Sequence, residues 1–423
     1  MTISFFFNFD VERSMFDVQF LHPSNQNELS PNSNCPDTGH RTPLFMKFET
    51  AAIHVGQTPE PETGAVIPPI YATSTFAQSA PGETRGYDYT RSGNPNFTNL
   101  EQTLCALEAA EFATVFASGM AAITAVISTL SSGDLVIAEE NIYGCTFRIY
   151  DKVFAKFGVA IEYYDLTDPA NDTIIAERSP QLVWLESPTN PLLKVLDIRR
   201  ISESAHKAGA AVVVDNTFAS PYFQKPLELG ADLSLSSTTK YINGHSDCLG
   251  GVVLSNNPEW YEKMVFAQKA IGLNPSPFDS WLISRGVKTL AVRMQKHAEN
   301  ALAFATCLEA HAKTNFVRYP FLESHPQHAI AKAQMTGGSG IVTAEFDLSL
   351  EAARKMLSRF EVFALAESLG GIESLVCHPA SMTHASIPRE QREAVGIRDG
   401  LVRFSVGIEH IDDLIVDFEH AIG

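Results

Sequence analysis

The sequence predicts an α/β protein whose main sheet is mostly parallel and is covered by helices on both faces. Between about residues 105 and 290, short apolar runs typical of buried strands alternate with longer runs whose apolar residues have helical spacing. The chain has 423 residues, of which 45% are hydrophobic and 19% charged, which suits a globular protein of two domains. We therefore expect a large α/β domain followed by a smaller α+β domain.

The elements of the large domain follow one another without an internal repeat. LEQTLCALEAAEF (100–112) places Leu100, Leu104 and Leu107 at helical spacing, and the residues that follow, FATVF, are typical of a strand. Further helices are expected in residues 121–130, 146–158 and 201–209. Further strands are expected in residues 134–140, 159–165, 181–187, 210–217 and 231–236.

The pattern changes at about residue 290. Residues 290–311 predict a long amphipathic helix that links two domains. After it we expect a strand in GSGIVTAEFDLS (338–349), a helix in LEAARKMLSRF (350–360) and a strand in LVRFSVGIE (401–409). The predicted domain limits are 105–290 for the large domain and 291–423 for the small one, with residues 46–104 preceding both.

Residues 1–45 differ from the rest of the chain. Leu21–Pro43 is rich in Asn, Ser and Pro and lacks apolar periodicity, which is typical of a disordered segment. We interpret residues 1–45 as an extension outside the fold and Met46 as the functional start. The beginning has no basic region and no small-residue cleavage site, and no run approaches the roughly 20 apolar residues that span a bilayer. We therefore expect a cytoplasmic protein.

Charge and cysteine content exclude several kinds of partner and site. A net charge of −18 gives an anionic surface that repels nucleic acid and anionic lipid, so we expect neither as a partner. Any anionic ligand then needs a local cationic or N–H site. The 6 cysteines form no CxxC pair and no Cys/His spacing suited to zinc. We expect no metal and interpret each cysteine as a reduced, buried apolar side chain.

The loops after the strands carry the candidate site, because ligands of parallel sheets bind at the carboxyl ends of the strands. Residues 117–120 (ASGM) lead directly from a strand into a helix. The N–H groups of Gly119 and Met120 at such a helix start can bind an anion. Taken alone, the same pattern also fits a plain turn.

The next three loops offer an aromatic ring, an amide and two carboxylates. Tyr143 follows the strand 134–140, where its ring can stack on a planar ligand or simply pack. Glu186 and Asn190 lie in the rigid turn after the strand 181–187. Asp215 follows an apolar run, where a buried carboxylate needs a cation or donors. It is placed to meet a protonated ring nitrogen, or to cap the next helix.

Lys240 lies in SSTTKYINGHSD (236–247), among hydroxyl groups that cannot neutralise it. Either its amine extends to water, or it is desolvated, loses its proton more easily and forms a Schiff base with an aldehyde. Ser237 and Thr239 offer hydroxyls to an anion on the same side. Together with the helix start, the tyrosine and the aspartate, these groups are what pyridoxal 5'-phosphate requires, so we predict that cofactor.

Long motifs in the chain resemble the trans-sulfuration (Cys/Met metabolism) family of pyridoxal-phosphate enzymes, across residues 46–423. The motifs are YDYTRSGNP (87–95), FASGMAA (116–122), ESPTNP (186–191), VVDNTFASPY (213–222), SSTTKYINGHSD (236–247), ESLGGIESLVCHPASMTH (367–384) and LVRFSVGIE (401–409). The resemblance implies the type I fold of PLP-dependent transferases, with a mostly parallel seven-stranded sheet and a smaller C-terminal α+β domain. It also implies a small amino-acid substrate and a role in methionine and cysteine biosynthesis.

The resemblance implies a role for each matching residue. Lys240 forms the Schiff base and then removes the substrate α-proton, Asp215 pairs with the pyridine nitrogen, and Tyr143 stacks on the cofactor and assists the leaving group. Positions at the phosphate are Gly119, Met120, Ser237 and Thr239, joined by Tyr89 and Arg91 from the neighbouring subunit, and positions at the substrate carboxylate are Asn190, Ser368 and Arg403. Residues 46–104 are then an arm that completes the neighbouring site, in a homotetramer of active dimers.

Two acids and a cysteine bear on the substrate. Glu367 and Asp88 match acids of cystathionine-handling members and suit a distal ammonium, whereas Cys145 resembles methionine γ-lyase. We weigh the acids over the cysteine and expect a cystathionine lyase. The choice between β- and γ-elimination stays open, as do two alternatives: cystathionine γ-synthase, which performs γ-replacement on an O-acylhomoserine, and methionine γ-lyase.

Two hypotheses of other classes are less well supported by the sequence. A cofactor-binding regulator would carry an added DNA-binding module, and residues 1–45 are too short, acidic and irregular for one. A metal-dependent hydrolase would use His245, Asp247 and His378, which lack the paired spacing of metal ligands.

Overall fold

Two sheets organise the chain in the computed structural model, which describes residues 46–385 and 389–423. The predictions for residues 1–45 lie outside the described residues. Residues 45–423 form one compact unit, so the predicted domain limits within it stay predictions. Every helix of the described part is too short or too polar to span a bilayer.

The first sheet has seven strands in the order β1-β7-β6-β5-β4-β2-β3. It is mostly parallel, as predicted, and β7 runs antiparallel to its neighbours β1 and β6. The strands are β1 (Phe112–Phe116), β2 (Leu135–Glu139), β3 (Ala160–Tyr164), β4 (Leu182–Glu186), β5 (Ala211–Asp215), β6 (Leu233–Ser236) and β7 (Gly251–Ser255). The sequence does not predict β7, because periodicity alone cannot distinguish so short an apolar run from a buried helix segment.

Helices cover both faces of this sheet, as the apolar spacing predicted. On one face, α3 (Gly119–Ile127), α4 (Gly144–Lys152) and α8 (Pro258–Ala267) pack on β-strand side chains such as Trp184. On the opposite face lie α2 (Pro95–Glu108), α5 (Asp172–Arg178), α6 (Ile198–Lys207) and α9 (Pro277–Val287). Because both faces are buried, the inner strands read as continuous apolar runs.

Side-chain caps fix where the helices around the site begin. The Ser118 side chain accepts a hydrogen bond from Ala121 N at the start of α3, and the Asp197 side chain accepts one from Arg200 N at the start of α6. Such caps satisfy N–H groups that have no partner inside the helix. They place the start of α3 directly after β1.

The second sheet has five strands in the order β10-β11-β12-β9-β8. The sequence predicts β9 and β12 but not the other three strands. The strands are β8 (Thr314–Arg318), β9 (Ile341–Phe346), β10 (Ala364–Leu365), β11 (Leu375–Cys377) and β12 (Leu401–Ser405). Its apolar core includes side chains of α10 (Leu290–Ala310), α12 (Leu350–Leu357) and α14 (Ile411–Ile422).

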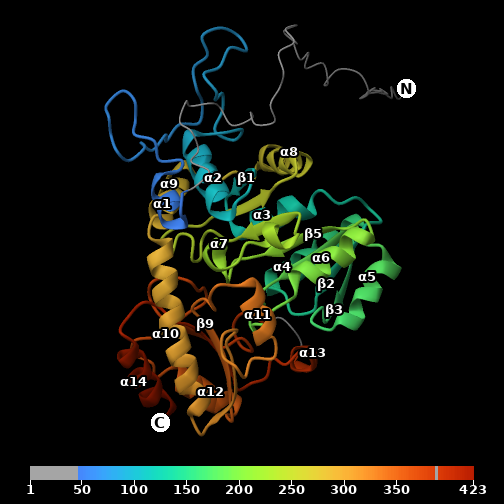
Figure 1. The fold of residues 1–423 in the computed structure, drawn as a ribbon, viewed down its shortest axis with the longest axis vertical. Coiled ribbons are helices and arrows are strands. Elements are labelled where there is room, and N and C mark those ends of the chain that lie inside the picture. The colour runs from blue at the N-terminus through green and yellow to red at the C-terminus, as the bar shows by residue number, and fades with distance from the viewer. Residues whose placement is uncertain (1–45, 386–388) are drawn as a thin grey trace, which may run out of the picture. The chain divides into compact units, whose positions relative to one another are not determined.

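The long helix α10 is present almost as predicted for residues 290–311, and its side chains belong to the cores of both sheets. Its first turns bury Leu290 and Met294 in the core that includes α2 and α9. Its later turns bury Phe304 and Leu308 in the core of the second sheet. Figure 1 shows α10 running from beside α9 down along the second sheet. The helix therefore connects the two parts as a continuous rod.

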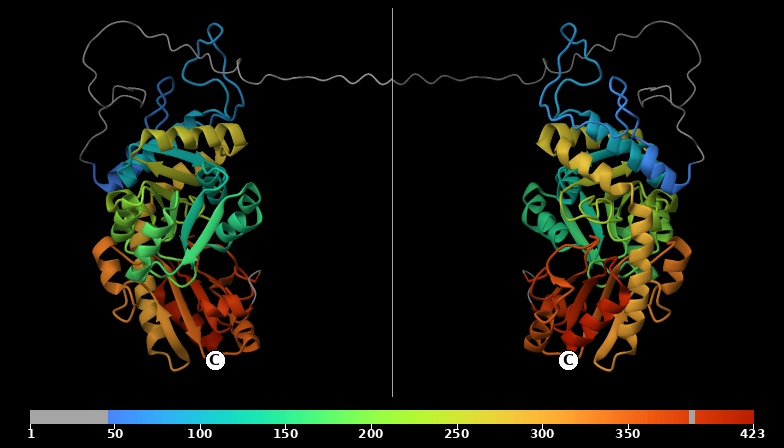
Figure 2. Two further views of the ribbon diagram at one scale, coloured as in Figure 1. Left: turned by 90° about the vertical axis from the view of Figure 1, so that its right-hand side faces the viewer. Right: turned by 90° about the vertical axis from the view of Figure 1, so that its left-hand side faces the viewer.

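The segment between α1 (Phe48–His54) and α2 has little regular structure and is mostly exposed. Figures 1 and 2 show its loops projecting beyond the helices that cover the first sheet. Val66 and Ile67 expose 74% and 47% of their surface there. The remaining helical segments are η1 (Phe154–Phe157), η2 (Pro169–Asn171), α7 (Ser220–Phe223), η3 (Pro226–Leu229), η4 (Gln268–Gly272), α11 (His328–Gln334) and α13 (Arg389–Ala394).

The prediction that all cysteines are buried is wrong for the described residues. Only Cys377 among them is buried, on β11, whereas Cys105, Cys145, Cys248 and Cys307 are half-buried. All five are free thiols, as predicted, and Cys35 lies outside the described residues. The wrong expectation came from an average tendency that ignores on which side of a helix or loop each cysteine falls.

Candidate active site

Lys240 lies in a tight turn four residues after β6. Its N–H donates to Ser237 O at 3.2 Å, and its carbonyl accepts from Gly244 N at 2.7 Å. The amine Nζ donates a hydrogen bond of 2.8 Å to Ser368 Oγ, and among the described residues no carboxylate forms an ion pair with it. Burial, together with the positive charge of Arg403, lowers the pKa of Lys240 to about 8. The amine is therefore easier to deprotonate than an ordinary lysine.

Arg403 on β12 reaches the same place from the second sheet. It is 3% exposed, and it donates from one guanidinium nitrogen to Asn190 Oδ1 at 2.9 Å and from another to Ser368 O at 2.8 Å. The three predicted carboxylate-binding residues are thus in contact, and Ser368 connects them to Lys240. A guanidinium with two directed N–H groups suits a carboxylate ligand.

Ser368 holds a backbone conformation that few residues other than glycine adopt. Its φ is +98°, which costs on the order of 1–3 kcal/mol for a residue with a Cβ. The conformation lets its carbonyl face Arg403 while its hydroxyl faces Lys240. Strain of this kind is typical of a functional site.

The start of α3 lies against Ser237, as an anion cradle requires. Ser118 takes up the N–H of Ala121, which leaves the N–H groups of Gly119 and Met120 without a partner among the described residues. A Cβ on Gly119 would lie 2.8 Å from Ser237 Cβ and 2.9 Å from Ser237 Oγ. Only glycine lets the helix start approach this hydroxyl, so free N–H groups and a hydroxyl meet at one point.

The hydroxyl of Thr239 already has hydrogen-bond partners, which its place in the sequence does not predict. Its hydroxyl donates to Gly250 O at 3.2 Å and accepts from Gly250 N at 3.0 Å. An anion bound beside Ser237 would have to compete with the bond to Gly250 O. Thr217, which is not among the residues predicted from the sequence, supports the cradle, because its hydroxyl accepts the N–H of Ser237 at 2.9 Å.

Asp215 ends β5 and is 6% exposed. One of its oxygens accepts from Thr217 N at 3.0 Å. Burial raises the pKa of Asp215 more than the hydrogen bonds from Thr217 lower it, and among the described residues no cation forms an ion pair with it. A buried carboxylate of this kind is stabilised by a cationic partner, and a protonated ring nitrogen would supply one.

Glu186 links two loops of the site in a way that its sequence position alone could not reveal. It is 4% exposed; one oxygen accepts from Tyr143 N at 2.7 Å and the other from Asn190 N at 2.7 Å. Burial, and then the neighbouring charge of Asp215, raise its pKa well above the usual range. In the sequence, the signal for their proximity is that both acids lie at the ends of predicted strands, 181–187 and 210–217; the register of β4 and β5 pairs Glu186 with Asp215.

Tyr143 precedes α4 and is half-buried. Burial raises its pKa, and the neighbouring Cys145 raises it further. Cys145 Sγ accepts a hydrogen bond of 2.7 Å from Arg148. The hydroxyl of Tyr143 therefore keeps its proton at neutral pH, which makes it a proton donor rather than a base.

Tyr89 and Arg91 lie on the exposed arm. The guanidinium carbon of Arg91 is 5.5 Å from the centroid of the Tyr89 ring, and Arg91 donates to Lys269 O at 2.8 Å. Neither residue contacts Lys240 of its own chain among the described hydrogen bonds and ion pairs. They line a hollow of about 400 Å³ together with Ala72, Thr73, Ser74, Thr90, Asn274 and Pro277.

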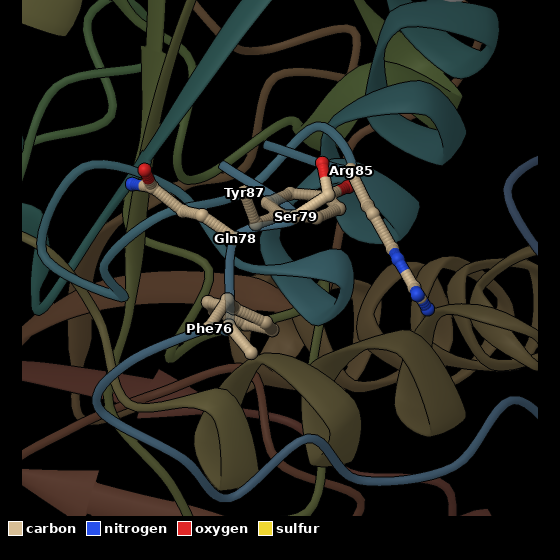
Figure 3. A pocket seen from close by; sticks show the side chains of 6 residues that line it. Phe76, Gln78, Ser79, Arg85 and Tyr87 are labelled. Atoms are coloured by element: carbon tan, nitrogen blue, oxygen red, sulfur yellow. The ribbon is translucent and has the colours of Figure 1, made fainter. Parts of the chain in front are cut away.

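A second hollow, of about 300 Å³, also belongs to the arm and not to the strand ends. Figure 3 shows the Tyr87 ring at its centre, with the Gln78 and Arg85 side chains pointing away from it. It is lined by Phe76, Ala77, Gln78, Ser79, Arg85 and Tyr87. None of these residues is among the predicted site residues.

The two acids proposed for substrate choice lie on different elements. Glu367 is exposed and precedes Ser368, and its charge raises the pKa of Lys240, against the larger effects of burial and Arg403. Asp88 is exposed on the arm and accepts from Tyr89 N at 2.6 Å. Their joint role at one substrate stays a prediction, because Asp88 would act from the arm.

The residues of the metal hypothesis each have other partners. His378 contacts Ser381 Oγ and Asp399 O, while His245 contacts Asn243 O and Asp247 accepts from the Asn243 amide. A cluster of Glu139, Glu140 and Asp165 has the proximity of metal ligands. Its centre is taken by Lys194 Nζ, which lies 3.0–3.1 Å from each carboxylate.

The arrangement fits pyridoxal phosphate in three independent respects. Among the described residues, the cradle at Gly119 has N–H groups without a partner for a phosphate, Asp215 is a buried carboxylate without a cation, and Lys240 is a half-buried amine without an anion. These lie at the carboxyl ends of β1, β5 and β6, which form one edge of the sheet.

Comparisons with known proteins match nearly the whole described chain. A family model described as "Cys/Met metabolism PLP-dependent enzyme" matches residues 49–423. A cystathionine γ-lyase of Dictyostelium discoideum is 49% identical over 90% of this chain and 98% of its own length. A cystathionine β-lyase of Coxiella burnetii is 46% identical over 89% of this chain and 97% of its own. A solved structure of cystathionine γ-synthase from Xanthomonas oryzae, in complex with cystathionine, is 44% identical with a TM-score of 0.87 over 89% of this chain and 98% of that one.

Proposed function

Because this chain belongs to the Cys/Met metabolism family of pyridoxal-phosphate-dependent enzymes, we propose that it is a carbon–sulfur lyase that cleaves cystathionine. The observation that carries the proposal is the contact chain from Lys240 through Ser368 to Arg403 and Asn190. It places an easily deprotonated amine beside a buried guanidinium, which is what an enzyme needs to act at the α-carbon of an amino acid.

The cofactor would be held by the edge of the first sheet. Gly119, Met120 and Ser237 would bind its phosphate, with Thr239 joining if its hydroxyl turns from Gly250. Asp215 would pair with its ring nitrogen. When bound, pyridoxal phosphate supplies an electron sink for the α-carbon of the substrate.

The chain's own residues would bind the substrate and move its protons. Arg403 and Asn190 would hold the substrate carboxylate, which orients the Cα–H bond toward Lys240. The Lys240 amine would accept that proton at Nζ, and Ser368 Oγ would keep Nζ in place between transfers. Tyr143, whose hydroxyl keeps its proton, would stack on the cofactor ring and donate a proton to the departing sulfur.

The exposed arm supports an assembly in which sites are shared. Tyr89 and Arg91 have no contact with Lys240 of their own chain, and the arm exposes large apolar side chains. We propose that both residues reach the phosphate in a neighbouring subunit, within a homotetramer of active dimers. The free thiols of the described residues agree with a reducing compartment such as the cytoplasm.

Two carbon–sulfur bonds of cystathionine are candidates for cleavage, one at Cβ and one at Cγ of the substrate. The β-lyase and γ-lyase names among the relatives differ in this respect, and γ-replacement by a synthase or methionine cleavage are the alternatives. Glu367 and Asp88 favour a substrate with a distal ammonium, which cystathionine has and methionine lacks. Incubation with cystathionine decides: pyruvate means β-cleavage and 2-oxobutyrate means γ-cleavage. Release of neither keto acid would overturn the lyase proposal.

A further inference from the structure

Three polar side chains form a buried stripe on α10, which we call the α10 stripe: Arg293, His297 and Asn300. They are 4%, 0% and 0% exposed, and their spacing of four and three residues puts them on one face of the helix. Each donates to backbone carbonyls outside the helix. Burying a polar group costs free energy unless it forms hydrogen bonds. The carbonyl groups that these side chains bind therefore indicate which segments the stripe holds.

Arg293 clamps the turn that carries Lys240. One guanidinium nitrogen donates to Tyr241 O at 2.7 Å and another to Ile242 O at 3.2 Å, the two residues directly after the lysine. A Cβ on Gly244 would lie 2.0 Å from this guanidinium, so the turn wraps closely around it. Among the described residues no carboxylate forms an ion pair with Arg293, so its charge is compensated by hydrogen bonds to carbonyl groups and to the Thr289 hydroxyl.

His297 and Asn300 hold the end of the strand that carries Arg403. The Nδ1 of His297 lies 2.7 Å from Val406 O, the residue directly after β12. The Asn300 amide donates to Gly407 O at 3.0 Å and to Glu409 O at 2.8 Å. Two turns of one helix thus grip the chain three to six residues after Arg403.

The two segments held by the stripe are also joined through Gly340, whose carbonyl accepts from Val406 N at 2.7 Å. The rings of Tyr241 and His297 meet edge to face with centroids 5.2 Å apart, and Tyr241 OH accepts from Gly340 N at 2.9 Å. A Cβ on Gly340 would lie 2.8 Å from Val406 O and 3.2 Å from His297 Cβ. The packing here leaves no room for the Lys240 turn and β12 to shift independently.

We propose that the α10 stripe is a positioning device that fixes Lys240 relative to Arg403: Arg293 holds the lysine turn, and His297 and Asn300 hold β12. The inference rests on the proposed function, since it needs Lys240 at the cofactor and Arg403 at the substrate carboxylate. The hydrogen bonds by which the three stripe residues hold these segments go to neighbours of Lys240 and Arg403 in sequence, and not to Lys240 or Arg403 themselves. A misplacement of about 1 Å can cost about a hundredfold in rate. Loss of the stripe should therefore slow reactions that need both the Lys240 site and Arg403 more than reactions that need the Lys240 site alone.

The test compares two reagents on the loaded enzyme. Aminooxyacetate and hydroxylamine both react with the aldehyde carbon of bound pyridoxal phosphate and displace the Lys240 amine, but only aminooxyacetate has a carboxylate for Arg403. The measurement is the ratio of their rate constants, from the loss of the visible absorbance band. His297→Phe keeps a ring against Tyr241 but loses the Nδ1 donor, whereas His297→Asn keeps an N–H donor. Glu299→Gln, on an exposed side chain of the same helix, is the control.

We expect His297→Phe to lower the ratio of aminooxyacetate to hydroxylamine rate constants about tenfold, with the hydroxylamine rate unchanged. His297→Asn should recover most of the ratio, and Glu299→Gln should keep it. An unchanged ratio in His297→Phe, or equal losses with both reagents, would overturn the inference. If that variant does not fold, Asn300→Ser, which removes both amide contacts without added bulk, is measured in its place. A wild-type enzyme with no band that hydroxylamine removes would instead overturn the proposed function.

Discussion

Lys240 Nζ donates to Ser368 Oγ at 2.8 Å, although the two residues are 128 positions apart in sequence. The contact joins the turn after β6 to the segment between β10 and β11, and so it joins the two sheets at the candidate site. Ser368 also reaches Arg403 through its carbonyl. One residue therefore lies between the proposed base and the proposed carboxylate site.

Ser368→Ala removes the hydrogen bond to Lys240 and leaves the backbone in place. We expect kcat/KM for cystathionine to fall about tenfold, since one such bond contributes about 1 kcal/mol and the amine would lose its orientation. Steady-state kinetics measure the effect. Ser368→Gly is the matched variant, because it also relieves the φ of +98°: it should fold at least as stably as Ser368→Ala while losing the same activity. Full activity in both variants would contradict the role of the hydroxyl.

Arg403→Lys keeps the positive charge but removes the two directed contacts to Asn190 and Ser368. The compact ammonium group of lysine cannot reproduce the two parallel N–H donors of a guanidinium. We expect KM for cystathionine to rise by about 10- to 100-fold, corresponding to about 1.5–3 kcal/mol for a charge-assisted bond, with a smaller change in kcat. Arg398→Lys, on a side chain that is 64% exposed, should leave KM unchanged. An unchanged KM in Arg403→Lys would remove Arg403 from the substrate site.

Uptake of the cofactor by the cofactor-free protein should report the ionisation of Lys240. Below pH 8 the amine is mostly protonated and cannot attack an aldehyde, and above it the free amine predominates, because burial and Arg403 lower the pKa to about 8. The rate at which the visible band appears should therefore rise with pH up to about 8 and then level off. A rate that keeps rising toward the ordinary lysine pKa of about 10.4 would contradict the structure. Lys240→Ala should give no band at any pH.

Glu108 on α2 gives a pH dependence of stability that is independent of catalysis. It is 2% exposed, its Oε1 has no partner among the described residues, and burial raises its pKa to about 8. The folded chain thus holds this proton up to about pH 8, whereas the unfolded chain releases it near 4.5. Stability from this group is present below about pH 4.5 and is lost as the pH rises through 8.

Glu108→Gln should remove that loss. We expect the free energy of unfolding of the variant, relative to that of the wild type, to be higher at pH 9 than at pH 5 by on the order of a few kcal/mol. Urea unfolding at the two pH values measures the difference. Glu111→Gln, at an exposed position near the end of the same helix, is the control. A difference between Glu108→Gln and the wild type that does not change with pH would mean that Glu108 titrates normally.

Arg91→Ala and Lys240→Ala test whether sites are shared between subunits. Each variant alone should be nearly inactive. In a refolded equal mixture, about half of the dimers are hybrids, and each hybrid has one site with both residues intact, so about a quarter of the wild-type activity should return. Activity assays before and after mixing measure this. No recovery in a mixture that still forms oligomers would place Arg91 at its own chain's site or outside any site.

The sequence predicted the site where topology alone determines proximity. Gly119, Asp215 and Lys240 follow strands of one mostly parallel sheet, and the carboxyl ends of such strands meet at one edge. The approach of Ser237 to the start of α3 follows from the same topology. The glycine at position 119 is consistent with it, because a Cβ there would clash with Ser237.

What the sequence could not predict depends on packing between distant segments. The double role of Glu186 requires two loops to turn their N–H groups toward one buried carboxylate. The contact of Ser368 with Lys240 requires a backbone conformation that residue type disfavours. In α10, Arg293 and His297 read as ordinary polar residues of an amphipathic helix, whereas the structure buries both.

The continuity of α10 has a consequence for how the molecule gains and loses its structure. The helix has 21 residues without a glycine or proline, and its two halves are buried in different apolar cores. Neither sheet can come apart without uncovering half of a helix on which the other depends, so the free energies of the two parts are coupled. The described chain should accordingly melt as one cooperative unit, and a native-like site should be absent from any partly folded form.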